Sequence, residues 1–284
     1  MVNAFIPQTL AEALAIRQNH PAVPLAGGTD LMVRKRSWAG TLPGFEQPVL
    51  LIGAVPGLRE VNLRDGVLTI GAAATLASLA EHPAVPEILK RAVAEMASPA
   101  IRNTGTLGGN ICNASPAADT LPPLYVLDAT LVLESSRERG AGRRAVPVTE
   151  FITGPGRTVL RDDELLTAVQ IPVENFQHEY YKKVGTRKAD ALSKASCAAL
   201  AKTEGGVVTE VRIALGAVAP RVVRSKAAEE FLKGKEVAAL PGLWPEIRKY
   251  YEPDIRPIDD QRSSAAYRSA VSFRLIEYFI SQIS

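Results

Sequence analysis

Short apolar runs and short helical patterns follow one another through the amino-terminal half of the chain. Small and apolar residues recur at helical spacing from Leu10 to Gln18, and a short strand then runs into Ala26-Gly27-Gly28, where the chain turns. The runs Val49–Ile52 and Val67–Ala73 adjoin glycines and predict strands. Helices are expected from Leu31, at Thr75–Ala80 and at Ile88–Met96, and another is expected to start at Leu121-Pro122-Pro123. A strand is expected at Thr130–Glu134.

The carboxyl-terminal part has longer strand patterns. The apolar segment Glu164–Pro172 and the strand candidate Gln177–Val184, which is partly polar on both faces, lie on either side of an expected domain boundary. Lys194–Thr203 and Thr209–Ala217 flank Glu204-Gly205-Gly206, which predicts an antiparallel hairpin with glycines in its turn. Helices are expected at Ser225–Leu232, ending at Gly234, and at Leu243–Tyr250. A last helix is expected to begin after a cap at Ser263 or Ser264. Its apolar face would contain Tyr267, Val271, Leu275, Ile276 and Phe279. This pattern predicts an α+β second domain.

The composition allows a buried core and limits the cofactors. The chain has 284 residues, of which 46% are hydrophobic, enough for about two domains. Its only cysteines are Cys112 and Cys197, whereas an iron–sulfur cluster takes about four ligands, so we expect any such cluster on a partner. No apolar run reaches the roughly 20 residues of a membrane span, and no signal-peptide pattern is present. A cytoplasmic protein with reduced thiols is therefore expected.

Charge gives little support for nucleic-acid binding. The 33 basic and 30 acidic residues are interspersed along the chain, with a net charge of +3. The clearest basic runs, Arg34-Lys35-Arg36 and Arg137–Arg144, have no aromatic residues beside them on which bases would stack. Both runs are interpreted as solvated surface, and no nucleic-acid partner is predicted.

The first candidate site is the passage Pro24–Leu31, a strand-to-helix corner that contains Gly27 and Gly28. Glycine lets backbone N–H groups approach an anion closely, and the start of the following helix adds unpaired N–H groups. These donors together suit a phosphate. A double glycine before a helix is also common as a plain turn, so this passage does not decide the function alone.

The second candidate site runs from Ile101 to Asn110 and continues through Ala114–Asp119. Three glycines and several hydroxyl or amide side chains fall in a stretch without a carboxylate before Asp119, and Arg102 lies within it. We expect a loop that hydrogen-bonds a diphosphate without placing negative charge against it. The alternative is a surface loop that is rich in glycine for flexibility, but two neutral donor loops in one half of the chain favour binding.

Other kinds of chemistry have little support. The chain contains no Gly-x-x-x-x-Gly-Lys-Ser/Thr and no Gly-x-Gly-x-x-Gly that opens a helix, which argues against a P-loop ATPase and a simple Rossmann domain. His20, His82 and His178 are far apart and belong to no zinc motif, so no metal site is predicted. No Gly-x-Ser-x-Gly elbow is present and neither cysteine has a nucleophile signature, so no catalytic residue is predicted.

Together the two passages resemble the FAD-binding subunit of molybdenum hydroxylases, the family of bacterial xanthine dehydrogenase and of the medium subunit of carbon monoxide dehydrogenase. The similar residues are Leu25-Ala26-Gly27-Gly28-Thr29-Asp30, Thr106-Leu107-Gly108-Gly109-Asn110 and Ala114-Ser115-Pro116-Ala117-Ala118-Asp119. Glu164–Pro172, Tyr181–Lys188 and Arg262–Arg268 are similar to later family segments, so the resemblance covers nearly the whole chain.

The fold that the resemblance implies is α+β. It consists of a two-part FAD-binding region of the vanillyl-alcohol-oxidase (PCMH) type and a small C-terminal domain of antiparallel sheet and helices. We expect the FAD-binding domain at residues 1–175, with subdomains at about 1–55 and 56–175, and a C-terminal domain of the CO dehydrogenase flavoprotein type at 176–284. The cysteine-rich [4Fe–4S] insertion of the benzoyl-CoA-reductase type is missing from this chain.

The resemblance also implies a set of cofactor contacts. The FAD diphosphate would be held through backbone and hydroxyl donors by Leu25, Ala26, Gly27, Gly28, Thr29, Asp30 and Leu31 together with Thr106, Gly108, Gly109 and Asn110. Asp119 and Lys183 match family positions at the cofactor, and Met96, Ile101, Ala118 and Leu166 match positions that line the flavin or adenine pocket. Leu192 falls where relatives place an apolar or aromatic residue against the isoalloxazine face, and we expect it to gate access of the electron acceptor.

Structural roles remain open for several of these residues. Met96, Ile101, Leu166 and Leu192 are of types that usually fill cores, and Lys183 could equally be solvated. A carboxylate at position 30 would repel a diphosphate, so we expect Asp30 to turn away and cap the local backbone.

The activity that the resemblance implies is electron transfer. The chain would bind FAD, receive single electrons from a [2Fe–2S] partner subunit and pass a pair to NAD or another acceptor, while hydroxylation takes place on a molybdopterin-binding large subunit. Heterotrimers paired into a larger assembly are implied. Two alternatives stay open: a self-contained flavin oxidase or reductase, and a nucleotide-binding assembly module without a redox role.

Overall fold

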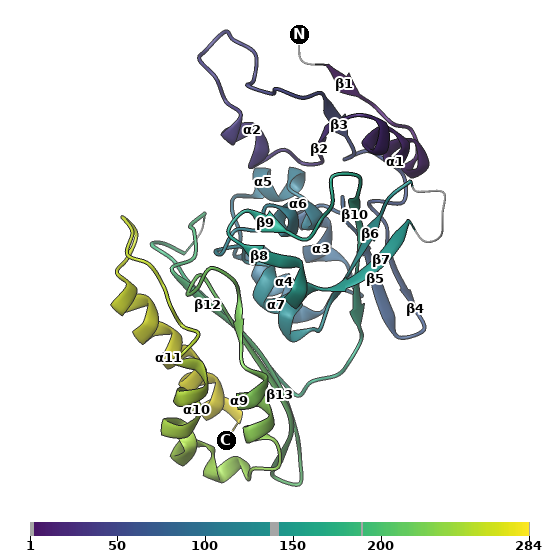
Figure 1. Ribbon diagram of the computed structural model, residues 1–284. Helices are drawn as coiled ribbons and strands as arrows, with labels where there is room; N and C mark the ends of the chain where they lie inside the picture. The colour runs from purple at the N-terminus through teal and green to yellow at the C-terminus, as the bar shows by residue number, and fades with distance from the viewer. Residues whose placement is uncertain (1–2, 137–141, 189, 284) are drawn as a thin grey trace. The chain divides into compact units, whose positions relative to one another are not determined.

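The computed structural model describes residues 3–136, 142–188 and 190–283. The chain forms two compact units, and each is built from separate stretches of sequence (Figure 1). Unit 1 contains Met1–Val85, Ser98–Ala114 and Ala129–Pro172. Unit 2 contains Pro86–Ala97, Ser115–Asp128 and Val173–Ser284. Mixed helices and sheets confirm the predicted α+β class, whereas the limits 1–175 and 176–284 stay a prediction.

Unit 1 begins with a small parallel sheet. Its strands lie in the order β1 (Ala4–Phe5), β3 (Val49–Leu51) and β2 (Val23–Leu25). Helix α1 (Leu10–Asn19) starts at Thr9, whose hydroxyl accepts the N–H of Glu12 at 3.1 Å. Leu50 of β3 and Leu14 of α1 share one apolar core with Ala22 and Ala26, which flank β2 before the chain turns toward α2 (Leu31–Arg34).

An antiparallel sheet of five strands forms the rest of the framework of unit 1. The order is β4 (Val61–Arg64), β5 (Val67–Gly71), β10 (Leu165–Pro172), β6 (Thr130–Glu134) and β7 (Arg143–Pro147). The edge strands β4 and β7 were not predicted from sequence, because both are short and carry mostly polar or exposed residues. In the basic run Arg137–Arg144, residues 137–141 lie outside the described residues.

Short helices and a small ribbon complete unit 1. They are α3 (Leu76–Glu81), α5 (Pro99–Thr104), α6 (Leu107–Cys112), α8 (Val148–Phe151) and the pair β8 (Ile152–Gly154) and β9 (Arg157–Thr158). Helix α6 follows an isolated bridge between Thr75 and Thr106 and lies against β10.

Unit 2 is built on an antiparallel sheet in the order β11 (His178–Val184), β12 (Ala195–Glu204), β13 (Val207–Gly216) and β14 (Val223–Arg224). Gly205 and Gly206 form the β12–β13 turn with φ of +57° and +79°. L side chains rarely adopt these angles, so the predicted glycine hairpin is confirmed. Helices α4 (Glu87–Ala94) and α7 (Leu121–Val126) also belong to this unit, and Gly216 of β13 approaches Pro122 of α7 closely.

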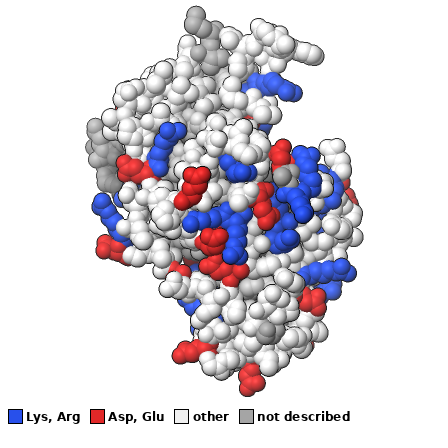
Figure 2. Space-filling model, turned by 180° about the vertical axis from the view of Figure 1, so that it is seen from behind, with Lys and Arg blue, Asp and Glu red and all other residues white. Residues whose placement is uncertain are grey.

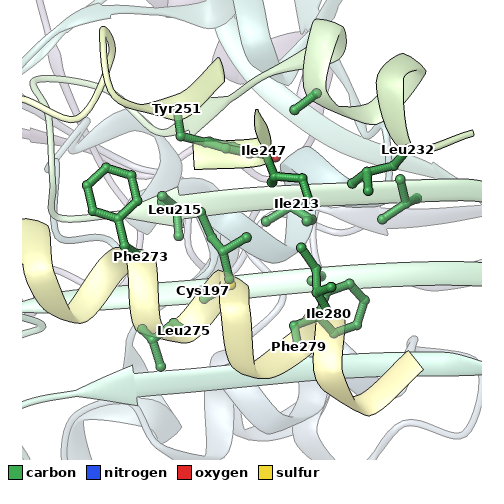
Figure 3. Packing of buried hydrophobic residues seen from close by; sticks show 14 of the residues in the cluster. Cys197, Ile213, Leu215, Leu232, Ile247, Tyr251, Phe273, Leu275, Phe279 and Ile280 are labelled. Carbon is green, nitrogen blue, oxygen red and sulfur yellow. The ribbon is translucent and has the colours of Figure 1, made fainter. Parts of the chain in front are cut away.

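One face of this sheet is covered by the helices of the C-terminal region. These are α9 (Lys226–Leu232), the 3-10 segment η1 (Val237–Leu243), α10 (Trp244–Tyr251) and α11 (Ala265–Ile283). Figure 3 shows Phe279 and Ile280 of α11 beside the strand residues Cys197 and Ile213 in one apolar cluster. Alternate strand residues point into this cluster, as the period of two requires.

The last helix departs from the sequence prediction in one position. The hydroxyl of Ser264 accepts the N–H of Tyr267 at 3.2 Å, so Ser264 rather than Ser263 caps α11. Tyr267, predicted on the buried face, is 46% exposed, with Lys194 Nζ over its ring at 5.4 Å. The first turn of α11 thus presents its aromatic ring to solvent, whereas Leu275, Ile276 and Phe279 are buried as expected.

The surface mixes charges of both signs. Lys and Arg side chains are interspersed with Asp and Glu over the face shown in Figure 2. Within the described ranges, no helix combines the length and the apolar character that a bilayer crossing requires.

Truncation of the α11 core should be costly in unit 2. Phe279 is 1% exposed, whereas the neighbouring Tyr278 is 50% exposed. We expect Phe279→Ala to lower the free energy of unfolding of unit 2 by about 3–5 kcal/mol, through lost burial and a new cavity. Tyr278→Ala, the control on the same helix, should cost about 1 kcal/mol. Chemical denaturation followed by circular dichroism measures both, and equal losses would contradict the packing of α11.

Candidate functional site

The first passage, Leu25–Leu31, forms the turn between β2 and α2. Gly28 has φ of +69°, a conformation that favours glycine. The N–H groups of Gly27, Gly28 and Thr29 donate to no acceptor within the ranges that the structure describes. All three residues are half-buried, and backbone donors of this kind are the groups that anion sites in proteins use.

The second passage, Ile101–Asn110, is helical rather than the predicted loop. It includes the end of α5 and most of α6. Thr106 caps α6 and accepts the N–H of Gly109 at 3.1 Å, and Leu107 and Ile111 are fully buried. Capping and burial offset the low helix propensity of the two glycines, which is why propensity alone led to the wrong prediction here.

The two passages meet in unit 1 through their backbones. A Cβ on Gly27 would lie 2.0 Å from the carbonyl oxygen of Thr104 and 2.9 Å from the Cα of Gly105. Thr29 Oγ1 lies 3.3 Å from the position of a Cβ on Gly105. We call residues Ala26–Asp30 with Thr104–Thr106 the glycine corner. The fold thus brings together the two passages that the sequence analysis singled out.

The backbone donors of the corner come mainly from the first passage. Gly108 N–H donates to the carbonyl of Ala72 at 2.8 Å, and Asn110 N–H donates to the carbonyl of Thr106 at 3.0 Å. Together with the Gly109 bond to the Thr106 hydroxyl, these bonds occupy N–H groups that we expected to face a ligand. A Cβ on Gly108 would lie 2.7 Å from the Ala72 oxygen, so this glycine is needed for packing.

Asp30 does not cap the local backbone, contrary to expectation. Its own backbone is in the right-handed helical region and its side chain makes no capping bond. The carboxylate instead lies 2.7 Å from Arg34 Nε, one helical turn on. Arg34 also donates to Asn113 Oδ1 at 2.8 Å. Although both charges are half exposed and their attraction is modest, Arg34 offsets the negative charge beside the corner.

Two further predicted contacts belong to unit 1. Leu166 in β10 is 5% exposed and pairs with Leu133 in the sheet, so it has the burial of a core residue. Ile101 in α5 is 38% exposed, which leaves part of its side chain available to a ligand. Their proposed place in the cofactor pocket stays a prediction.

Asp119 and Lys183 form a buried ion pair in unit 2. Lys183 Nζ lies 2.6 Å from Asp119 Oδ2 and donates to the Glu95 carbonyl at 3.1 Å. The lysine side chain is only 5% exposed, so the alternative of a solvated Lys183 is wrong. Ser193 Oγ donates to the other carboxylate oxygen at 2.5 Å. Burial raises the pKa of the Asp119 carboxyl, and the Lys183 ammonium and the Ser193 hydroxyl oppose that rise.

The other predicted residues of unit 2 differ in exposure. Ala118 is buried and Met96 is half-buried. Leu192 is 59% exposed, so the alternative that it fills a core is wrong. Sequence reasoning missed Ser193 and the Glu95 carbonyl, because no spacing in the chain links them to Asp119.

Among the residues whose placement is described, no group of three or more His, Cys, Asp or Glu side chains is placed to hold a metal ion. Cys112 and Cys197 are free thiols. Burial raises the pKa of Cys112 to about 12 and also raises that of Cys197, so neither is a thiolate nucleophile at neutral pH.

Family models match both parts of the chain. Residues 1–174 match the FAD binding domain in molybdopterin dehydrogenase, and residues 179–283 match the CO dehydrogenase flavoprotein C-terminal domain.

Similar proteins and solved structures belong to the same kind of enzyme subunit. A xanthine dehydrogenase FAD-binding subunit of Escherichia coli O157:H7 is 35% identical over 229 residues, covering 78% of this chain and 76% of that protein. A nicotinate dehydrogenase FAD-subunit of Eubacterium barkeri is 33% identical over 244 residues, covering 81% and 79%. A carbon monoxide dehydrogenase structure from Hydrogenophaga pseudoflava superimposes with a TM-score of 0.86 at 27% identity, covering 98% of this chain and 95% of that one. The chain therefore belongs to the family of FAD-binding oxidoreductase subunits of the molybdopterin dehydrogenases, as the two glycine passages indicated.

Proposed function

We propose that this chain is the electron-transfer subunit of a molybdenum hydroxylase that resembles xanthine dehydrogenase. It takes electrons from a [2Fe–2S] subunit and passes them to NAD or another soluble acceptor, while a molybdopterin-binding large subunit carries out hydroxylation. The observation that carries the proposal is the glycine corner, in which two passages distant in sequence meet and leave backbone donors free.

The glycine corner fits the diphosphate of FAD. Neither Gly27 nor Gly28 carries a Cβ that would keep phosphate oxygens away from the backbone. The N–H groups of Gly27, Gly28 and Thr29 supply neutral donors, and the Arg34 pair offsets the charge of Asp30. Such donors stabilise an anion without requiring a charged side chain. The remaining residues of the first passage, Leu25, Ala26 and Leu31, complete the proposed diphosphate site.

The side chains of the second passage and of unit 2 are proposed as further FAD contacts. Thr106 and Asn110 would contribute polar groups, and Gly109 leaves an exposed surface open to the ligand. In unit 2, the residues proposed to contact FAD, as the family resemblance implies, are Asp119, Lys183, Met96, Ala118 and Leu192. The Asp119–Lys183 pair is satisfied within the unit, so it would lie near the cofactor without adding a net charge.

The redox chemistry would come from the cofactor. When bound, FAD supplies one-electron and two-electron chemistry, which suits a junction between an iron–sulfur partner and a two-electron acceptor. The chain binds and orients the group. This division explains why the sequence shows no acid, base or nucleophile arrangement of its own.

The partners are proposed from composition and from the relatives. Two cysteines cannot supply the ligands of an iron–sulfur cluster, so single electrons must arrive from another chain. The relatives are named as subunits or medium chains of larger enzymes. A cytoplasmic location, with both cysteines reduced, is part of the same proposal.

A charge placed in the first passage should expel FAD. We expect Gly28→Asp to weaken FAD binding about tenfold or more relative to Gly28→Asn, because the two side chains are isosteric and only Asp repels the diphosphate. Asn tolerates the positive φ of this position, so it serves as the matched control. Flavin fluorescence titration of the apoprotein measures both, and equal affinities would contradict a diphosphate at this turn.

The second passage offers an independent test at Gly109. This residue is exposed in the first turn of α6, where an acidic side chain stabilises a helix. A Cβ at this position would lie 2.9 Å from Thr106 Oγ1, a contact that Asp and Asn share. Gly109→Asp should therefore bind FAD about tenfold more weakly than Gly109→Asn, for the same electrostatic reason. The absorption spectrum of the purified variants and their thermal unfolding are the measurements. Full flavin content in the Asp variant would remove this passage from the site.

The isolated chain should bind FAD without oxidising an organic substrate. We expect added FAD to give a flavin spectrum that stays oxidised when xanthine or similar heterocycles are supplied without partners. Bleaching of the flavin by such a substrate would instead favour a self-contained oxidase. A colourless chain that fails to bind FAD would favour an assembly module.

A further inference from the structure

The connection between β11 and β12 is anchored at both of its ends. Lys194 N–H donates to the Val184 carbonyl at 2.7 Å and closes the neck of the connection. The described residues between them are 185–188 and 190–193. Thr186, Arg187, Lys188 and Asp190 are all exposed, so the outer part of the connection has little packing of its own.

Residues at both ends of the connection bind the same buried carboxylate, that of Asp119, and we call these two residues, Lys183 and Ser193, its anchors. Lys183, just before the connection, holds Asp119 Oδ2 at 2.6 Å, and Ser193, near its end, holds Asp119 Oδ1 at 2.5 Å. Ser193 is 1% exposed and Asp119 is 6% exposed, so water does not compete for these bonds. Asp119 belongs to the segment before α7, and it therefore ties the connection to a helix of unit 2.

The polar contacts between Arg187 and Asp190 do not reach Asp119: Arg187 donates to the Asp190 carbonyl at 2.5 Å, within the connection itself. Arg187 and Asp190 lie 3.7 Å apart and both side chains are more than half exposed. Exposed pairs of this kind contribute little. A hydroxyl that donates to a buried carboxylate contributes more, because its loss leaves a charged oxygen buried without a partner.

We propose that Ser193 is a positioning residue: with Lys183 it fixes the β11–β12 connection to Asp119 and so sets the position of the adjacent, exposed Leu192. The first part of this inference stands on unit 2 alone. Its consequence for the flavin rests on the proposed function, in which Leu192 lies at the isoalloxazine face.

The anchoring is tested by limited trypsin digestion of the holoprotein. Arg187 and Lys188 supply exposed cleavage sites inside the connection. At a temperature well below the thermal midpoints of both variants, Ser193→Ala should raise the cleavage rate there about tenfold over Ser196→Ala, because local opening of the connection becomes easier. Ser196→Ala is the matched control, since Ser196 is also buried, at 2%, and its hydroxyl does not contact Asp119.

A second variant allows the test to be made even if Ser193→Ala does not fold. Ser193→Cys is close in shape to serine but donates more weakly, and it should give a cleavage rate between those of wild type and the alanine variant. If Ser193→Ala does not fold, the Cys variant carries the comparison with Ser196→Ala. Cleavage at the Ser196→Ala rate in the folded Ser193 variants would overturn the proposal.

Iodide quenching of bound FAD fluorescence tests the consequence for Leu192. Ser193→Ala should raise the quenching constant about twofold, and Ser196→Ala should leave it unchanged, because a loosened connection admits the quencher. Faster proteolysis with unchanged quenching would confirm the anchor and remove Leu192 from the flavin face. A chain that binds no FAD would refute the proposed function and leave the proteolysis result standing.

Discussion

The contact of Gly27 with the backbone of Thr104 and Gly105 is the constraint on which the candidate site depends. At 2.0 Å from the position of a Cβ, the Thr104 oxygen leaves no room for any side chain at residue 27. The end of β2 and the end of α5 can therefore approach only through glycine. The hydrogen bonds of this turn use carbonyl groups, such as that of Gly28, which accepts the Met32 N–H at 2.9 Å, whereas the N–H groups of Gly27, Gly28 and Thr29 donate to no acceptor among the described residues.

Unit 2 contains a buried ion pair, whereas the polar groups of the glycine corner are backbone donors. Its ionisable groups at Asp119 and Lys183 are buried and paired, with a second donor from Ser193. Removing one partner from such a cluster leaves an uncompensated buried charge, so the cluster holds its members in one arrangement. Unit 1 thus presents neutral backbone donors, whereas unit 2 presents a neutralised pair.

Most of the elements could be predicted from local pattern. The hairpin around Gly205 and Gly206, the strand Thr130–Glu134 and the capped helix after Ser225 all appear where periodicity and turn chemistry placed them. The failures have physical causes. Helix α6 forms despite two glycines because Thr106 caps it and Leu107 and Ile111 are buried, and neither effect is contained in glycine propensity.

By itself the sequence determined where the glycine-rich passages lie and where the chain must turn, because composition and local spacing decide those properties. Tertiary structure alone decided that Gly27 meets Thr104, that Gly108 N–H is used by Ala72, and that Asp119 joins Lys183 and Ser193. These partners are tens of residues apart, and no local pattern encodes a contact whose strength comes from burial. Only tertiary packing excludes water from these groups, and their hydrogen bonds and ion pair are stronger as a result.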